Sequence, residues 1–387
     1  MKVLYDFQAY DLQTHGGVSR CMYELYKNLP SNVEKEISVL ETKNVYLKEE
    51  GIPSSLYDKF ISRKNFPLKR FLYKLYYNIK YNKCRKLDVW PKVNRFYSKK
   101  RIKKGDFDIF HPTFFDAYFL RALGKKPFVL IIHDMIPELY PQYYSRNDFQ
   151  INMRKILVHR AAHIVAVSEN TKKDVMRLYN LPEEKITVIY HGADETPYIP
   201  YKNPDFDFSY ILYVGDRNFY KNFVNFILAS LPVLKKHPEL KIVCTGRQFT
   251  PEERFFFNAL GIAHRIKHIF VTDDSQFLDL YHNAVAFVYP SEYEGFGIPI
   301  LEAYKAGCPV MLNNASCFPE IAGDAAIYFY MNKDESNFAE KFEELYSMSQ
   351  EERKELLNKQ YERLKKFSWK KSAEQLAEVY KSIISKS

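Results

Sequence analysis

The chain has 387 residues, more than one hydrophobic core usually serves, so its length excludes a single small module and predicts two domains. Its 46% of hydrophobic residues excludes general disorder, and its five cysteines, never spaced C-x-x-C, argue against a disulfide framework or a zinc ribbon. The formal net charge is +10, and the excess lies between residues 57 and 104, where 12 Lys and 5 Arg face two Asp. Apolar runs such as Phe128–Ile132 are too short to span a bilayer, and residues 1–10 lack a long apolar segment, so we expect a soluble or peripheral protein.

The first half of the chain alternates short apolar strands with helices. Lys2–Tyr5 predicts a buried strand, and a polar loop with Gly16 and Gly17 leads into a helix near Val18–Leu29. Further strands are predicted at residues 109–110, 128–132, 164–167 and 186–189, with helical stretches at 148–162 and 170–179. This alternation predicts a parallel sheet.

The second half repeats the pattern after a predicted linker at residues 193–209, which is rich in Pro, Asp and Tyr. Strands are predicted at 210–214, 241–245, 269–271 and 286–289, with helices from about 222 and at 275–283. Residues 336–387 predict three helical stretches, broken near Phe367, with Ser368 placed to cap the last one. We therefore predict two doubly wound α/β domains, residues 1–200 and 205–368, with helix 370–387 joining the first, and a ligand cleft between them at the strand ends.

The most specific string is EGFGIPILE at residues 294–302, which follows the strand at 286–289 and enters a helix. Free N–H groups and the positive end of that helix favour a phosphate or sugar hydroxyls across the loop. Glu302 in the first turn can accept from a ribose diol, while Glu294 points from the loop into the cleft. The alternative, in which both residues only cap or solvate the helix start, stays open.

A second string, residues 215–222, directly follows the strand at 210–214. Arg217 and Lys221 lie there at a helix entrance, where two cations would meet a polyphosphate. Basic residues at helix starts are common, so this signal is weak by itself. The G-x-x-x-x-G-K-[ST] pattern and a complete G-x-G-x-x-G are absent from the sequence, which argues against an ATPase and an ordinary dehydrogenase.

With these strings the chain resembles the retaining GT-B glycosyltransferases of family 4 (glycosyl transferases group 1) over nearly its whole length. Glu294 and Glu302 look like the E-x7-E motif of the family, and Arg217 and Lys221 look like its donor-diphosphate cations. His133 resembles its cleft histidine. Other matching strings are Gly16-Gly17, Val167-Ser168-Glu169, Tyr190-His191-Gly192 and residues 313–324. The resemblance implies the GT-B fold, two Rossmann-like domains facing each other across a cleft.

The resemblance also implies an activity: retaining, metal-independent transfer of a hexose, mannose or glucose type favoured, from a GDP or UDP sugar to a glycan or polyprenyl-linked acceptor in bacterial surface polysaccharide biosynthesis. It implies no cofactor. The expected catalytic residues are Glu294 at the transferred sugar, Lys221 and Arg217 at the leaving diphosphate, and His133 near the anomeric carbon. Expected donor-binding residues are Gly16, Gly17, Gly215, Arg217, Lys221, Val271, Gly295, Phe296, Gly297 and, at the ribose, Glu302. Two alternatives stay open, a sugar-nucleotide epimerase or hydrolase of the same fold and a non-catalytic nucleotide-sugar sensor.

The basic block at residues 57–104 interleaves Lys and Arg with Phe, Tyr and Leu, so anionic membrane and nucleic acid are both physically suitable partners. We expect membrane and no nucleic acid, because enzymes of family 4 often extend a glycan on a lipid carrier. The expected membrane or acceptor patch is Lys69, Arg70, Phe71 and Lys74, on a cytoplasmic protein peripheral to the inner face of the plasma membrane. The alternative is a solvated helical insertion.

Four patterns suggest a metal, yet we predict none. Residues 106–108 and 205–207 are D-x-D strings, the metal motif of the other large glycosyltransferase fold, but two tandem α/β halves do not suit that single-domain fold. The pairs His159/His163 and His264/His268 stand at helical spacing without an H-E-x-x-H motif. We interpret them as structural or surface histidines. His133, without the family argument, would also suit a strand end where its hydrogen bonds are satisfied.

Overall fold

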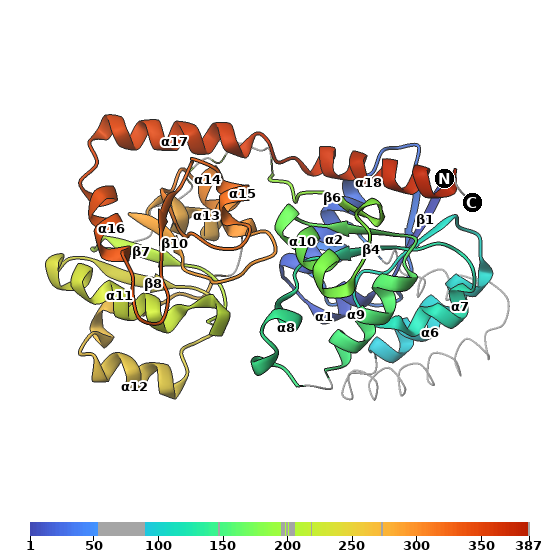
Figure 1. Cartoon of the computed structure of the whole chain (residues 1–387), viewed down its shortest axis with the longest axis horizontal. Coiled ribbons are helices and arrows are strands. Elements are labelled where there is room, and N and C mark those ends of the chain that lie inside the picture. Colours follow the sequence, from blue (N-terminus) through green and yellow to red (C-terminus); the bar gives the residue numbers. More distant parts are fainter. Residues whose placement is uncertain are drawn as a thin grey trace, which may run out of the picture.

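Buried runs of branched and aromatic residues form most strands of this chain, with helices between them. The structure, a computed structural model, describes residues 1–52, 90–145, 148–194, 198, 200, 206–217, 219–271 and 274–385. Two α/β halves lie side by side along the long axis of the molecule (Figure 1). Within the described ranges, no helix is long and apolar enough to cross a membrane.

The first half contains two three-stranded parallel sheets, linked by a bridge between Phe110 and Phe128. Their strand orders are β2-β1-β3 and β4-β5-β6, with bounds β1 Lys2–Tyr5, β2 Glu34–Ile37, β3 Ile109–His111, β4 Val129–Ile132, β5 His163–Ala166 and β6 Ile186–Val188. All residues of β3 and β4 are buried, as expected of parallel strands covered on both faces. The helices and turns of this half are α1 Gln8–Leu12, α2 Gly17–Asn28, α3 Val45–Glu49, α6 Trp90–Lys104, η1 Ala117–Phe119, α7 Leu120–Leu123, α8 Ile136–Leu139, η2 Pro141–Tyr143, α9 Phe149–Arg160, α10 Glu169–Tyr179 and η3 Glu183–Lys185.

The second half holds one six-stranded parallel sheet in the order β12-β11-β10-β7-β8-β9. Its strands are β7 Tyr210–Tyr213, β8 Lys241–Cys244, β9 Ile266–His268, β10 Ala286–Tyr289, β11 Val310–Asn313 and β12 Ile327–Phe329. The order reverses between β7 and β10, so the loops after these two strands flank the crevice where doubly wound sheets bind ligands. The strand predicted at 269–271 is wrong. The strand in this region, β9, covers the three residues before it and pairs with β8, with Cys244 opposite His268.

The helices of the second half include two with reciprocal caps. Thr250 and Glu253 form a capping box on α12, and Ser349 and Glu352 form one on α17. Each box satisfies two backbone N–H groups that the first helical turn leaves unpaired. The elements are η4 Phe219–Lys221, α11 Phe223–Lys236, α12 Pro251–Ala259, η5 Ala263–Arg265, α13 Asp274–His282, α14 Ile298–Lys305, α15 Phe318–Ala322, α16 Phe338–Tyr346 and α17 Gln350–Leu364.

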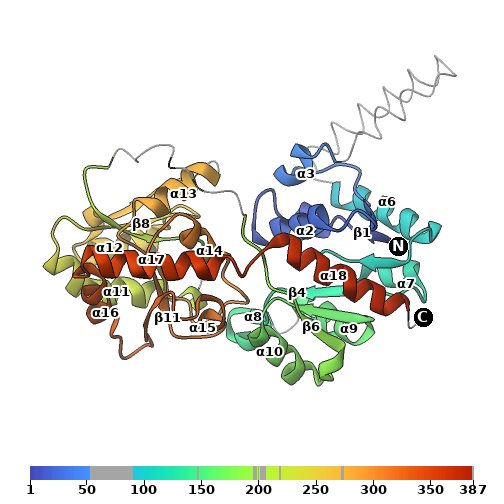
Figure 2. The ribbon, with the colours of Figure 1, turned by 90° about the horizontal axis from the view of Figure 1, so that it is seen from above.

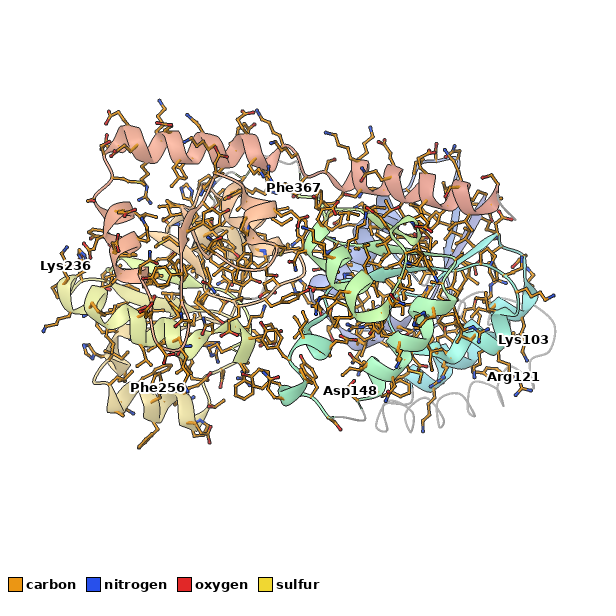
Figure 3. The ribbon with its side chains drawn as sticks, viewed as in Figure 1. Lys103, Arg121, Asp148, Lys236, Phe256 and Phe367 are labelled. Atoms are coloured by element: carbon orange, nitrogen blue, oxygen red, sulfur yellow. The ribbon has the colours of Figure 1, made fainter. Side chains whose placement is uncertain are left out.

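The chain passes between the halves at two adjacent points. Ala193 bridges Ser368, and Gly192 lies so close that a Cβ on it would be 2.0 Å from the Trp369 nitrogen. Phe367 marks this junction in Figure 3, between α17 and α18 (Trp369–Ile384). Figure 2 shows α18 running back across the first half, close to α2. Ser368 takes the N-cap position of α18, but the predicted cap is wrong, since its side chain makes no cap hydrogen bond.

Candidate active site

The Glu294 loop joins β10 to α14 and is held by the turn at Ser316. Gly297, the N-cap of α14, has a φ of 95°, a conformation that L side chains rarely adopt. Ser316 Oγ accepts from the Glu294 N–H at 3.2 Å and donates to the Glu294 carbonyl at 2.7 Å. Cys317 Sγ donates to the same carbonyl at 3.2 Å. These contacts fix the backbone on which the largely buried Glu294 side chain stands.

Gly295 brings the two halves into direct contact. A Cβ at this position would lie 1.6 Å from the His133 carbonyl oxygen, so glycine alone fits. From the first half, the hydroxyls of Ser168 and Thr171 donate to the Gly295 carbonyl at 2.7 and 3.3 Å. The loop that follows β10 and the loop that follows β4 therefore meet at one place.

Lys221 and Glu294 form an ion pair at the reversal of the strand order. Lys221 Nζ donates to Glu294 Oε1 at 2.5 Å and lies 3.4 Å from the Tyr289 hydroxyl. The side chains of Lys221 and Glu294 are 15% and 10% exposed, so their charges lie at the edge of solvent. The structure thus brings together one predicted cation and one predicted carboxylate.

Arg217 lies apart from this pair. Its guanidinium donates to Glu253 at 2.8 Å and to the carbonyls of Arg247 and Gln248 at 2.7 and 3.0 Å, and it packs 4.8 Å from the ring of Phe249. The Arg217 side chain is fully buried. In this structure Arg217 is therefore not an open cation beside Lys221, because its donors already bind protein groups.

Glu302 lies on α14 and contacts the first half. Arg20 on α2, which the sequence analysis missed, donates to Glu302 Oε1 at 2.9 Å, and Tyr281 donates to Oε2 at 3.3 Å. A pocket of about 70 Å³ opens beside Glu302. It is lined from both halves, by Arg20, Gly192, Ala193, Asp194, Phe277, Leu278, Ile298, Leu301, Glu302, Lys305 and Trp369.

The Gly16–Gly17 loop faces the start of α14. Gly16 is the N-cap of α2, and a Cβ on Gly17 would lie 4.0 Å from Ile298 Cδ1. This glycine loop and the first turn of α14 therefore border each other across the two halves.

The other expected donor residues lie around the second sheet. Gly215 follows β7 with a φ of 106°. Phe296 is buried with its ring 4.8 Å from that of His191, so its side chain belongs to the core and only its backbone can serve a ligand. Val271 is half-buried, and residues 272–273 after it lie outside the described residues.

His133 follows β4 and is half-buried. Burial lowers its pKa to about 4, so the ring is neutral at pH 7. Within the described residues no hydrogen bond reaches this ring. The ring of His191 lies 5.9 Å away, and Cys21 Sγ lies 3.3 Å from His191 Nδ1.

The described residues of the four metal-like patterns have other partners or lie in different elements. Asp106 pairs with Arg101 and Lys104, and Asp108 accepts from the Lys2 backbone, while Asp205 lies outside the described residues. Neither histidine pair lies on one helix. His159 lies in the last turn of α9 and His163 begins β5, while His264 lies in η5 and His268 in β9. Among the described residues, the group with metal-like spacing is Cys21, His133 and His191.

The predicted patch of Lys69, Arg70, Phe71 and Lys74 lies outside the described residues. The described end of the basic block, α6, packs into the first half: Asn94 donates to the carbonyl of Glu41, and Ser98 shares a hydrogen bond with Ser38. Three basic residues of α6 form ion pairs with carboxylates, namely Arg95, Arg101 and Lys104. This end of the block is thus part of the folded first half.

Comparisons with known proteins agree with this arrangement. The family glycosyl transferases group 1 matches residues 200–382, and glycosyltransferase family 4 matches residues 15–196. The O-antigen chain mannosyltransferase RfbU of Salmonella typhimurium is 28% identical over 207 residues, which cover 54% of this chain and 58% of that protein, less than two thirds of its length. The O-antigen chain mannosyltransferase B of Escherichia coli is 27% identical over 272 residues, covering 65% and 70%.

Solved structures share the fold. Anabaena Alr3699/HepE in complex with UDP and glucose superposes with a TM-score of 0.71 at 17% identity, over 99% of this chain and 100% of that one. Sucrose-phosphate synthase from Thermosynechococcus elongatus gives 0.71 at 15% identity, over 100% of both chains. The predicted GT-B fold of two Rossmann-like halves is confirmed. The chain belongs to the group 1, family 4 glycosyltransferases.

Proposed function

We propose that this protein transfers a hexose, of the mannose or glucose type, from a nucleotide diphosphate sugar to a hydroxyl of a glycan or lipid-linked oligosaccharide, with retention at the anomeric carbon and without a metal. The observation that carries the proposal is the Lys221–Glu294 pair at 2.5 Å, placed where the strand order reverses and in a loop that touches His133. Two relatives are O-antigen chain mannosyltransferases, which supports the sugar and the role in surface polysaccharide synthesis. The UDP complex of HepE supports a nucleotide diphosphate donor.

In the proposed reaction, the bond between the anomeric carbon and the diphosphate oxygen breaks, and the acceptor oxygen bonds to the same face of the sugar. The acceptor proton passes to the leaving diphosphate. Lys221 offsets the charge that develops on the leaving phosphate, an electrostatic task that preorganised cations perform well. Glu294 accepts from a hydroxyl of the transferred sugar.

His133 has a distinct task because it is neutral. The transition state of glycosyl transfer carries positive charge on the sugar ring, as in glycoside hydrolysis. An imidazolium at this place would repel that charge, whereas an imidazole whose pKa is lowered to about 4 can hydrogen-bond to the sugar without repelling it. Glu302, already oriented by Arg20 and Tyr281, accepts from the ribose hydroxyls.

The test is turnover by the full chain with GDP, UDP and dTDP sugars, with and without a polyprenyl-linked or glycan acceptor. Acceptor-dependent release of nucleoside diphosphate, with the donor anomeric configuration in the product by NMR and with EDTA present, is the expected result. Turnover of donor alone would replace the proposal with an epimerase or hydrolase. Nucleotide binding, seen as a thermal shift, without turnover would replace it with a sensor.

We further propose that residues 1–200 with 370–387 form one domain and that residues 205–368 form the other.

We also propose that the basic block at 57–104 holds the first domain against anionic lipid on the cytoplasmic face of the membrane. Each Lys or Arg near such a surface contributes about 1 kcal/mol, screened by salt. We expect co-sedimentation with anionic liposomes that weakens with salt and with Lys69, Arg70 and Lys74 changed to Glu. The matched control changes three exposed lysines, Lys354, Lys359 and Lys366, to Glu. Equal loss in both triple variants would leave only an effect of net charge.

A further inference from the structure

Three side chains of the first half, two histidines and one cysteine, form a close group. The proposed sugar transfer uses only one of them, His133. Cys21 comes from α2, His133 from the loop after β4 and His191 from the segment after β6. One ligand-type atom of each lies within 4.8 Å of the others. Cys21 and His191 are buried, while His133 is half-buried, so the group has one open side.

The chemistry of this group matches a transition-metal site. Thiolate and imidazole together suit Zn²⁺, and three protein ligands plus one open position are the usual set at a reactive zinc site. Zinc bonds are about 2.3 Å to sulfur and about 2.0 Å to nitrogen, which in a tetrahedral site places ligand atoms roughly 3.3–3.6 Å apart. The three atoms here, within 4.8 Å of one another, would have to draw closer when the metal binds.

Two carboxylates and one guanidinium act electrostatically on the group. Glu24 acts on Cys21 and Asp134 acts on His133 as negative charges, while Arg154 opposes them at His133. Cys21 Sγ lies 3.3 Å from His191 Nδ1 and shares a hydrogen bond with it, so these two ligand atoms are already neighbours.

We propose that Cys21, His133 and His191 form a site for one Zn²⁺ ion or a similar thiophilic divalent cation. On binding, the Cys21 S–H bond gives its proton to bulk water and the sulfur bonds to the metal, while both imidazoles bind through neutral nitrogens. A water molecule or a ligand group completes the fourth position. No electron transfer is involved.

A metal ion at this site would bind a nitrogen of the His133 ring and keep it from the sugar. The inhibition that follows from this rests on the proposed function. A transferase that uses a neutral His133 beside the sugar is then inhibited by zinc, although the transfer itself uses no metal. Metal binding and inhibition are separate measurements, so failure of one is distinguishable from failure of the other.

The first experiment measures binding without any substrate. The metal-free full chain is titrated with Zn²⁺ against a chromophoric chelator, and with Co²⁺ while thiolate-to-cobalt charge-transfer and tetrahedral d–d bands are recorded. We expect the titration to show one metal ion bound per chain, and the cobalt spectrum to show a thiolate-to-cobalt charge-transfer band. Loss of a group outside the ligand set already costs roughly tenfold or more in affinity, so Cys21→Ser and His133→Asn should each weaken binding by more than that.

Controls separate this site from general thiol or histidine binding. Cys308→Ser alters an equally buried cysteine that is not part of this group and should keep the wild-type affinity and band. His133→Asn, at the half-buried position, tests the site if Cys21→Ser does not fold. Retention of the thiolate band in both Cys21→Ser and His133→Asn, or no cobalt band in the wild type, overturns the proposal.

The second experiment measures donor turnover with increasing Zn²⁺. Inhibition should follow the binding curve and be reversed by chelator. A zinc-bound enzyme with full activity would keep the metal site but remove His133 from the proposed reaction.

Discussion

Arg20 on α2 donates to the carboxylate of Glu302 on α14 at 2.9 Å, and this ion pair joins the two halves beside the pocket. The two side chains are 21% and 19% exposed, so water screens their attraction only in part. Tyr281 donates to the other carboxylate oxygen. Both interactions orient Glu302 before any ligand arrives.

We expect Arg20→Ala to weaken nucleoside diphosphate binding by about two- to fivefold, the scale of roughly 0.5–1 kcal/mol for a partly exposed ion pair. The measurement is calorimetric titration with GDP and UDP of Arg20→Ala, Glu302→Ala and the double variant. The double variant should bind no worse than Glu302→Ala, because both changes remove the same interaction. Lys236→Ala, which breaks a pair with Glu343 within the second half, is the control. Additive losses would contradict the coupling.

The Lys221–Glu294 pair should act on rate more than on affinity. Lys221→Ala should cost roughly 2–4 kcal/mol of transition-state stabilisation, the scale for one preorganised charge-stabilising group. Glu294→Ala should mainly lower kcat, whereas Glu302→Ala should mainly raise KM for the donor. Steady-state kinetics of the three variants check this. Unchanged activity in both glutamate variants would remove the E-x7-E assignment.

Arg217 provides a contrast with Lys221. Arg217→Ala leaves Glu253, whose side chain is 16% exposed, without its buried partner, and removing one partner of a buried pair costs about 3–5 kcal/mol of unfolding free energy. Lys221→Ala also leaves a carboxylate, that of Glu294, without its partner, but Arg217→Ala removes in addition the donor to the carbonyls of Arg247 and Gln248. Urea unfolding should therefore show a larger loss of unfolding free energy for Arg217→Ala than for Lys221→Ala. If Arg217→Ala keeps wild-type stability and loses turnover, its expected role at the diphosphate is restored.

Gly295→Ala should force the two halves apart, because the new Cβ would lie 1.6 Å from the His133 carbonyl oxygen, a backbone atom that cannot rotate away. We expect near-complete loss of turnover and a larger radius of gyration by X-ray scattering. Ser168→Ala removes one hydrogen bond to the same residue without a steric clash. It should lower the free energy of unfolding by only about 1 kcal/mol. A compact, active Gly295→Ala protein would show that this contact is not needed for turnover.

Much of this arrangement is predictable because strands and motifs are local in sequence. The strand at 286–289 and the loop that carries Glu294 are found where their apolar run and glycines indicate. β2 is missed because its sequence, Glu34–Ile37, holds three charged residues and one apolar residue, so no apolar run marks it. β9 is displaced from its predicted position because isoleucines stand at both 266 and 269, and only pairing with β8 selects the first.

Contacts between distant residues are what sequence reasoning cannot supply. The sequence predicts Arg217 at the leaving diphosphate, yet in the structure it pairs with Glu253, 36 residues later. Cys21 and His191 stand 170 residues apart, and Arg20 and Glu302 stand 282 apart. Only the packing of α2 against both the loop after β6 and α14 brings them together, and no spacing rule predicts such a meeting.

The two chain crossings at Gly192 and Trp369 limit how the halves can move. A single flexible connection would let one half rotate in any direction relative to the other. Two connections that touch, with Ala193 bridging Ser368, act as a hinge. Rotation about the line through them remains, while sliding and twisting would stretch one segment against the other. We therefore expect relative motion of the two halves to be mainly a rotation about these crossings, and a side chain in place of Gly192, whose Cβ would meet the Trp369 nitrogen, to hinder it.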